Sequence, residues 1–386
     1  MGYAETIWSD PVDFLRTVAP DHPVLFLSPA ALQAQAQRFL TGFAGLVTYA
    51  VKANPDESVI TNLAAAGITG FDVASPGEIA LIRRLVPGAA LHYNNPVRTR
   101  DEIAFAVAQG VTSYSVDAQS ELDKLAAQVP PGGADARPVE ISVRFKLPVG
   151  GASYDFGAKF GAGETLAATL LRRVATLGFS PSLTFHPGTQ CVDPQAWVAY
   201  IRAAARIATA AGVGITRLNV GGGFPSHRMH RHAPSIEAIL SAINLATAEV
   251  FGATAPALVC EPGRALVADS FALLVRVKAV RDGDHVFLND GIYGAFSEQP
   301  LVAATDRLTA WSPRGAERRG TARARTVFGP TCDSIDRLPG EIPLPGDIEE
   351  GDYLLVQGMG AYSAVTSTRF NGFGALALHP VLDLRA

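Results

Sequence analysis

Residues 46–53 of this chain are LVTYAVKA, a short run of apolar and β-branched residues with a lysine, Lys52, near its C-terminal end. Seven further runs of this kind follow before residue 264, and longer Ala- and Leu-rich segments lie between them. The eight runs are 46–53, 70–75, 90–95, 113–117, 141–145, 182–188, 217–222 and 257–263. Runs that are apolar almost throughout are typical of strands covered on both faces.

The segments between these runs have the spacing of helices, with apolar residues at i, i+3 and i+4. The clearest examples are 57–66, 76–85, 118–128, 165–177, 195–211 and 236–251. Eight strand–helix units predict a parallel (β/α)8 TIM barrel. The alternative is a doubly wound open sheet, which usually has fewer strands and a glycine-rich turn after the first. Here the first run is followed by Asn54 and Pro55 instead.

The pattern changes after residue 268, where strand-like runs follow one another with few helical segments between them. These runs are 270–280, 285–288, 325–328, 352–357 and 373–378, and 22–27 resembles them. We therefore expect an α/β plus all-β chain: a barrel over 28–268 and a β-sandwich or β-barrel domain from 1–27 and 269–386.

Composition excludes several classes of protein. The chain has 386 residues, of which 48% are hydrophobic and 18% charged, so it is not a disordered chain. Its net charge of −4 gives no general reason to expect a nucleic-acid or membrane partner, and the basic segment 314–325 is expected to be a solvated loop. No apolar run is expected to be long enough to cross a membrane. Three widely spaced cysteines and the absence of a signal-like N-terminus favour a reducing, cytoplasmic location.

In a barrel, functional groups project from the C-terminal ends of the strands. Polar and charged residues stand at these predicted ends: Lys52, Asp72, Asn95, Asp117, Arg144, His186, 221–223, and Glu261 with Arg264. Lys52 is expected to be partly desolvated, which exposes a nucleophilic amine able to hold an aldehyde cofactor as a Schiff base. The alternative is a lysine whose stem covers apolar surface while its amine reaches water.

Three further features suit an anionic, flat cofactor. The glycines 221–223 leave backbone N–H groups accessible to a phosphate, although a plain tight turn would look the same. Glu261 is able to pair with a protonated ring nitrogen and Arg264 with a phosphate, unless the two form an ion pair that only closes the barrel. His186 has the shape to stack on a ring, with Thr189 nearby, but lone histidines are more often structural.

Outside the barrel, Cys332 lies in a turn-rich loop, 329–334, and is a candidate proton donor. Cys191 and Cys260 are expected to be buried thiols. The histidines at 227, 230 and 232 are not interpreted as a metal site, because no carboxylate or thiol stands at ligand spacing.

Ten segments occur together in one order. They are YAVKAN (49–54), FDVASPGEI (71–79), KFG (159–161), FHPGTQC (185–191), NVGGGFP (219–225), EPGR (261–264), NDGIYGAF (289–296), GPTCDSID (329–336), MGAYS (359–363) and FNGF (370–373). In this order the chain resembles the fold type III, or alanine-racemase-fold, PLP-dependent decarboxylases, and the ornithine/lysine decarboxylase group among them.

The resemblance implies pyridoxal 5'-phosphate as the cofactor, and it implies roles for individual residues. Lys52 would hold the cofactor covalently, Glu261 would keep its ring nitrogen protonated, His186 would stack on the ring and Cys332 would be the proton donor. The phosphate would be bound by Thr189, Gly222, Gly223, Arg264 and Tyr362. Asp72 and Arg144 would support Lys52 and the ring. The substrate would contact Asp333, Tyr293 and Phe370.

The activity implied is decarboxylation of a basic L-amino acid such as ornithine or lysine to a diamine, as in polyamine biosynthesis. A homodimer is also implied, with Cys332 and Asp333 entering the active site of the other subunit. Two features depart from the group: Val302 stands where a second acidic substrate contact is expected, with Glu298 as a nearby substitute, and Pro187 and Thr189 replace the usual Val and Ser. Alternatives are decarboxylation of another amine-bearing amino acid (a diaminopimelate-like one, for example), racemisation, or a catalytically inactive binding protein.

Overall fold

The computed structural model describes residues 7–132, 138–148, 150, 153, 157–229, 234–302 and 306–385. These fall into two compact units. One consists of the described parts of Met1–Gln35, Ser226–Pro234 and Arg264–Ala386, and the other of Ala36–Pro225 and Ser235–Gly263. The chain thus leaves the second unit at the end of its last barrel strand, and each unit is described by itself.

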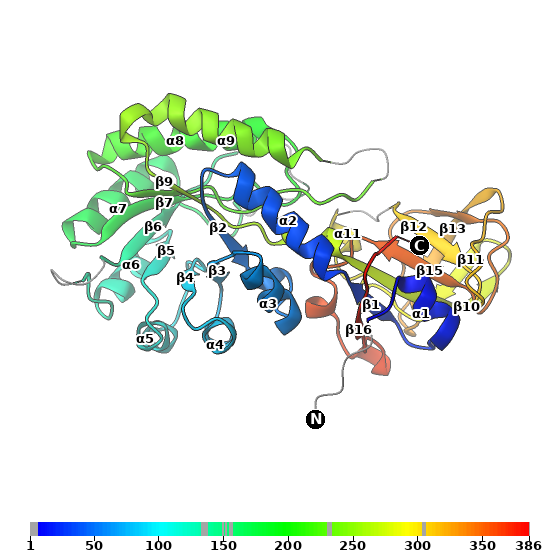
Figure 1. The fold of residues 1–386 in the computed structure, drawn as a ribbon. Helices are drawn as coiled ribbons and strands as arrows, with labels where there is room; N and C mark the ends of the chain where they lie inside the picture. The colour runs from blue at the N-terminus through cyan, green and yellow to red at the C-terminus, as the bar shows by residue number, and fades with distance from the viewer. Residues whose placement is uncertain are drawn as a thin grey trace. The chain divides into compact units, whose positions relative to one another are not determined.

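The second unit is a closed barrel of eight parallel strands, so the predicted fold class is confirmed. Its strands are β2 (Gly45–Ala50), β3 (Gly70–Val73), β4 (Ala90–Tyr93), β5 (Ser113–Val116), β6 (Glu140–Arg144), β7 (Ser180–Thr184), β8 (Arg217–Asn219) and β9 (Ala257–Cys260). The helices that alternate with them are α3 (Glu57–Ala65), α4 (Pro76–Leu85), α5 (Arg100–Ala108), α6 (Gln119–Ala126), α7 (Glu164–Thr176), α8 (Pro194–Ala211) and α9 (Ile236–Phe251), which Figure 1 shows around the strands. Helix α2 (Pro29–Gly42) precedes the first strand.

Most barrel strands are shorter than the apolar runs that predicted them. Strand β2 ends at Ala50, and the next three residues form a 3-10 turn, η1 (Val51–Ala53). The backbone therefore bends just before Lys52. The hydroxyl of Tyr49 donates to the carbonyl oxygen of Asn54 at 2.8 Å, which ties β2 to the residue that follows this turn. The C-terminal residues of each run thus lie on loops above the sheet, where they are free to form a site.

One helix is apolar enough to resemble a membrane span. Among the described residues, Ile236–Thr254 meets that criterion by length and composition, with a mean hydropathy of 1.4. The expectation that no such run exists is therefore wrong by this criterion. In the fold, Ile236, Ile239, Leu240 and Ile243 are buried, as their helical spacing predicted.

The first unit is built on a mixed sheet. Its strands are β1 (Val24–Leu27), β10 (Phe271–Arg281), β11 (His285–Leu288), β12 (Leu308–Trp311), β13 (Ala322–Phe328), β14 (Ile342–Pro345), β15 (Tyr353–Gln357) and β16 (Ala377–Pro380). This unit also contains helices α1 (Pro11–Val18), α10 (Arg264–Val267) and α11 (Gln299–Val302) and the 3-10 turns η3 (Ala268–Ser270), η4 (Ala364–Thr366) and η5 (Phe370–Gly372). The 3-10 turn η2 (Gly252–Thr254) follows α9 in the second unit.

The long strand β10 organises this sheet. It pairs antiparallel with β1, β11 and β15, and β1 in turn pairs parallel with β16. The predicted strand at 22–27 is confirmed, since Phe26 lies opposite Ala272. Strands β12 and β14 escaped prediction, and β16 was predicted only in part, since the run 373–378 includes just its first two residues. Each is only four residues long, too short for an alternating pattern to stand out.

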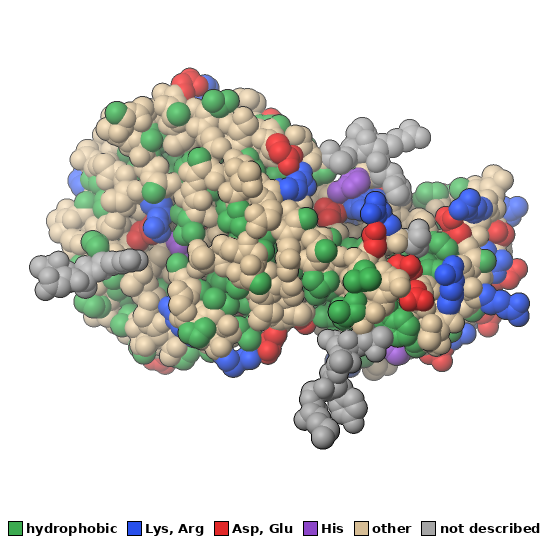
Figure 2. Space-filling model, viewed as in Figure 1, with side chains coloured by type: hydrophobic (Ala, Val, Ile, Leu, Met, Phe, Trp, Pro, Cys, Tyr) green, Lys and Arg blue, Asp and Glu red, His purple; other side chains and the backbone are tan. Residues whose placement is uncertain are grey.

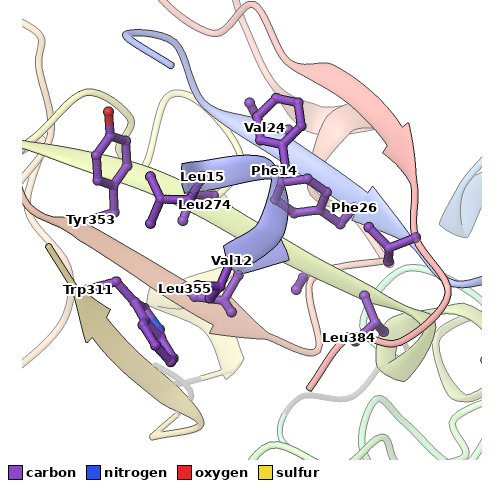
Figure 3. Close-up of a cluster of buried hydrophobic side chains, with 12 residues drawn as sticks. Val12, Phe14, Leu15, Val24, Phe26, Leu274, Trp311, Tyr353, Leu355 and Leu384 are labelled. Atoms are coloured by element: carbon purple, nitrogen blue, oxygen red, sulfur yellow. The ribbon is translucent and has the colours of Figure 1, made fainter. Parts of the chain in front are cut away.

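An apolar cluster closes one face of this sheet. Helix α1 lays Phe14 against β1, with the rings of Phe14 and Phe26 5.2 Å apart and edge to face (Figure 3). Leu274, Leu355 and Trp311 come from three neighbouring strands and complete the cluster. Burial of such side chains contributes roughly 1.5–3 kcal/mol each.

Charged side chains of both signs are interspersed on the face seen in Figure 2. The segment 314–325 illustrates this, because it is not simply a solvated loop as predicted. Its last residues belong to β13, and Arg325 is buried. Arg318 pairs with Asp352 at 2.9 Å and with Glu349 at 3.0 Å. Neighbouring acids thus neutralise part of the basic segment.

Candidate active site

Lys52 lies above β2 with an accessible amine. Its side chain is 48% exposed, and Nζ is 3.3 Å from Oδ2 of Asp72, a buried residue of β3. Glu78, in the first turn of α4, is also close: burial first, and then the charge of Asp72, raise the pKa of its carboxyl group. The lysine amine is therefore accessible for reaction, and its contact with the buried Asp72 carboxylate orients it.

Glu261 follows β9 and is buried at the same end of the barrel. Its Oε1 accepts hydrogen bonds from Nδ2 of Asn94, after β4, and from Nδ2 of Asn219, at the end of β8. Burial is the main reason that the pKa of this carboxyl group is raised, and the charge of Asp72 adds to the effect. Lys52, the Asn219 amide and Arg144 act in the opposite direction.

The glycine turn that follows β8 has no room for side chains. Gly221 and Gly223 have positive φ angles of 69° and 83°, which favour glycine. A Cβ at Gly222 would lie 2.7 Å from the carbonyl oxygen of Glu261, and one at Gly223 would collide with the carbonyl oxygen of Gly188. The glycines are therefore required by the backbone, and the turn presents main-chain atoms rather than side chains.

His186, just after β7, is held as a neutral ring. The backbone N–H of Gly188 donates to its Nδ1 at 3.1 Å, so that nitrogen is an acceptor. Burial, and then the charges of Arg144 and Lys52, hold the pKa of the imidazole well below its usual value. His186 also lies beside the glycine turn, since a Cβ on Gly222 would come within 3.3 Å of Nε2.

Arg144 and Thr189 complete the barrel set. Arg144, the last residue of β6, lies with its guanidinium 5.0 Å from the centre of the Phe160 ring. Burial lowers its pKa, while the charge of Glu261, and then those of Asp117 and Asp72, act in the opposite direction. Thr189 is buried in the loop after β7, and its carbonyl oxygen accepts from the N–H of Ser153 at 2.8 Å.

In the other unit, Arg264 begins α10 and is buried. Its guanidinium pairs with Glu298 and lies 4.9 Å from the centre of the Tyr362 ring. Tyr362 has a positive φ of 54°. Glu298 had been considered as a substitute contact for a substrate amine. Its pairing with Arg264 instead makes it a partner of the predicted phosphate-binding arginine.

Cys332 and Asp333 lie together in a loop of the same unit. Cys332 is an exposed free thiol, and its backbone N–H donates to Oδ1 of Asn371 at 3.0 Å. The hydroxyl of Tyr293 donates to Oδ2 of Asp333 at 2.5 Å, and this bond lowers the pKa of that carboxyl group. Phe370 lies against the Tyr293 ring, with 4.8 Å between centres.

A cavity of about 430 Å³ is lined by this loop and by β10 and β11. The predicted substrate-contact residues Tyr293, Asp333 and Phe370 are neighbours, because Tyr293 contacts both of the others. Val302 is buried at the end of α11, and 303–305 lie outside the described residues.

Cys191 and Cys260 are buried, as expected. Two of the three histidines near residue 230, His230 and His232, fall outside the described part of the chain. Within the described part, no group of three potential ligands could hold a metal ion.

Sequence reasoning missed Asn94 and Asn219. Asn94 lies near the end of the predicted run 90–95, and Asn219 lies within the run 217–222. Neither is charged, so neither stands out from its sequence as Asp72 or Glu261 does. The structure shows that Asn95 bonds to the Ala74 carbonyl oxygen at 3.3 Å, whereas its neighbour reaches Glu261. Each amide contacts a carboxylate that is distant in the sequence, so the contact can be recognised only from the closed barrel.

These barrel residues fit pyridoxal 5'-phosphate. An accessible amine, a neutral flat ring and a buried carboxylate lie at one end of the barrel, and the turn after β8 exposes backbone where side chains would collide. These are the groups that an aldehyde, a pyridine ring, a ring nitrogen and a phosphate require.

Comparison with known proteins also indicates a pyridoxal-phosphate enzyme. Residues 30–268 match the family model for the pyridoxal-dependent decarboxylase, pyridoxal binding domain. The chain is 32% identical over 352 residues to ornithine decarboxylase of Mus musculus, covering 84% of this chain and 73% of that protein. It is 34% identical over 335 residues to lysine/ornithine decarboxylase of Selenomonas ruminantium, covering 85% and 81%.

Among solved structures, the arginine decarboxylase of Paramecium bursaria Chlorella virus superposes with a TM-score of 0.84 at 26% identity, covering 95% of this chain and 98% of that one. The family match spans more than half of the chain, and the two relatives are matched over most of their length. The chain therefore belongs to the pyridoxal-dependent decarboxylases and is a PLP-dependent amino-acid decarboxylase.

Proposed function

We propose that this enzyme decarboxylates a basic L-amino acid with a distal amine, such as ornithine or lysine, to the corresponding diamine. The observation that carries the proposal is the pairing of Tyr293 with Asp333 beside the exposed thiol of Cys332. The hydrogen bond keeps the pKa of Asp333 low, so its carboxylate is charged and able to attract an amine. The related proteins are named for ornithine, lysine and arginine.

In the barrel, Lys52 would bind the cofactor through its amine, and Asp72 would orient that amine. His186 would cover one face of the ring, and its neutral state avoids placing a second positive charge there. Glu261 would accept a hydrogen bond from the protonated ring nitrogen, a role suited to a buried carboxylate whose raised pKa makes it more basic. When bound, the cofactor withdraws the electron pair left on the α-carbon as carbon dioxide departs.

The phosphate would be held by the backbone at Gly222 and Gly223 and by Thr189. Arg144 would support the ring.

Cys332 would return a proton to the α-carbon, while Asp333 binds the distal amine and Phe370 packs on the carbon chain. We propose that these residues serve the active site of a second copy of the chain in a homodimer. Ile335, 64% exposed, and Phe370, 41% exposed, support this, because they leave apolar surface uncovered beside the thiol.

Carbon dioxide release from a series of amino acids tests the substrate class. Ornithine, lysine, arginine and diaminopimelate differ in length and charge, and norleucine is a matched control because it has lysine's length without the amine. We expect release from at least one diamino acid and none from norleucine. Equal release from lysine and norleucine would contradict a charge-based substrate site.

Asp333→Asn then tests the proposed amine contact. Losing the carboxylate should raise the KM for the diamino acid about tenfold or more, because a hydrogen bond to a charged group is lost, and should leave cofactor affinity unchanged. Ser334→Ala, at an exposed position of the same loop, is the control for general disturbance. An equal loss of cofactor affinity and of substrate affinity in Asp333→Asn would remove Asp333 from substrate recognition.

A further inference from the structure

One oxygen of Glu261 is occupied by two amide donors from opposite sides. Asn94 reaches it from the loop after β4, and Asn219 reaches it from the end of β8. The identity of the donating atom in Asn219 is fixed by its other contact: Oδ1 accepts from the N–H of Gly221 at 2.9 Å, so Nδ2 must face the carboxylate. The carboxylate is therefore held from two strands that are far apart in the sequence.

The same network connects this carboxylate to the glycine turn. The backbone N–H of Glu261 donates to the carbonyl oxygen of Gly221 at 2.9 Å, and Asn219 bonds to both residues through its side chain. A change in the rotamer of Glu261 would therefore break its contacts with Asn94 and Asn219, and Asn219 is also bonded to the glycine turn.

Two N–H donors on one oxygen have two physical consequences. They favour the ionised carboxylate, which burial and the neighbouring Asp72 disfavour. They also occupy Oε1 and leave Oε2 as the acceptor for a ligand. The other charged groups acting on Glu261 are Lys52 and Arg144, which likewise favour its charged form.

We propose that Asn94 and Asn219 are positioning residues that hold Glu261 as an oriented carboxylate, with Oε2 directed to the ring nitrogen of pyridoxal 5'-phosphate. The proposal concerns cofactor chemistry and is independent of which amino acid is decarboxylated. It also explains why two polar amides are buried at strand ends: they satisfy a carboxylate that would otherwise lack hydrogen bonds.

Asn94→Ala is the cleaner of the two possible tests. It removes one donor but keeps the backbone carbonyl oxygen of Asn94, which accepts from Ser115 Oγ at 2.7 Å. Asn219→Ala would also release the N–H of Gly221, so it serves as the second variant. Each protein is reconstituted with 15N-labelled pyridoxal 5'-phosphate, and two quantities are measured: the dissociation constant of the cofactor and the 15N chemical shift of its ring nitrogen.

We expect Asn94→Ala to weaken cofactor binding about tenfold, the order expected for one hydrogen bond to a charged group. The ring-nitrogen signal should move toward that of Glu261→Gln, in which the nitrogen has no anionic partner. In the Glu261→Gln background, the further change Asn94→Ala should have no effect on the signal, because there is no carboxylate left to position.

Asn95→Ala is the matched control, since this neighbouring amide bonds to the Ala74 carbonyl oxygen and should leave the ring-nitrogen signal in place. The proposal is overturned if Asn94→Ala and Asn219→Ala both give the wild-type signal and affinity. It is also overturned if Asn94→Ala causes the same loss with and without the Glu261 carboxylate, which would indicate a merely structural role.

Discussion

Cys332 is the proposed proton donor, and its exposed position in a loop suits that role. Its thiol is exposed and bonded to no other cysteine, while Cys191 and Cys260 are buried. We predict that Cys332→Ala retains cofactor binding but lowers kcat by about 10²-fold or more, the usual contribution of a positioned general acid. Steady-state kinetics and the absorbance of the bound cofactor measure the two effects separately.

Ser334→Ala provides the comparison, because it changes an exposed residue of the same loop without removing the thiol. Wild-type kcat in Cys332→Ala would refute the proton-donor role.

His186 should make stability depend on pH in a specific direction. In the folded protein the pKa of its imidazole lies well below 6.5, the ordinary value, so only the unfolded chain takes up this proton as pH falls below that value. The unfolded state then binds more protons, and the free energy of unfolding falls with decreasing pH, by at most about 1.4 kcal/mol per pH unit for this group. Urea unfolding of the apoenzyme between pH 7.5 and 5, as an approximate window around the unfolded pKa, measures the slope.

His186→Gln should flatten this dependence, because a neutral side chain replaces the titrating one. The buried His92, whose pKa is also lowered by burial, keeps part of the slope. His22→Gln, at an exposed position, is the control for histidine removal. A variant curve parallel to that of the wild type would show that His186 does not stay neutral in the fold.

At the level of the element, the turn after β8 is the most constrained segment of the barrel. A methyl group at Gly222 would press on the Glu261 carbonyl oxygen and on His186. We predict that Gly222→Ala destabilises the protein by roughly 1–3 kcal/mol through overpacking. Its cofactor affinity should also fall by about tenfold or more, because the backbone N–H groups move out of place.

Gly214→Ala is the matched control, since nothing lies within 4 Å of a Cβ at that position, which also precedes β8. Both variants are compared by urea unfolding and by cofactor titration. Equal stability and equal cofactor affinity in the two variants would mean that the turn tolerates a side chain and does not bind the phosphate closely.

The elements themselves could be predicted, but their ends could not. The apolar runs located all eight barrel strands, because a strand buried on both faces has a continuous signature. They also placed Lys52 inside a strand, whereas η1 begins at Val51. The reason is that hydrophobicity reports burial rather than backbone direction, and Val51 and Ala53 are buried in the turn.

At the level of the whole molecule, the proposed homodimer predicts that two inactive variants restore each other. Lys52→Ala and Cys332→Ala should each be nearly inactive alone. In mixed dimers, one of the two sites would contain both an intact lysine and an intact cysteine. Coexpression of equal amounts should therefore recover about one quarter of the wild-type activity, since half of the dimers are mixed.

Differently tagged subunits, purified through both tags, allow the mixed dimers to be assayed alone. A chain carrying both substitutions, paired with Lys52→Ala, is the control and should recover nothing. Absence of activity in purified mixed dimers of the two single variants would place both residues in one chain's site.

The sequence by itself determined the barrel and the second sheet and named the candidate reactive groups, because strand periodicity and the chemistry of lysine, glutamate and cysteine are local properties. Only the tertiary structure decided that Asn94 and Asn219 converge on Glu261 and that Glu298 pairs with Arg264. These contacts join residues that are 167, 42 and 34 positions apart. Their hydrogen-bonding groups are brought together by barrel closure and packing. The sequence around each residue therefore does not indicate its distant partner.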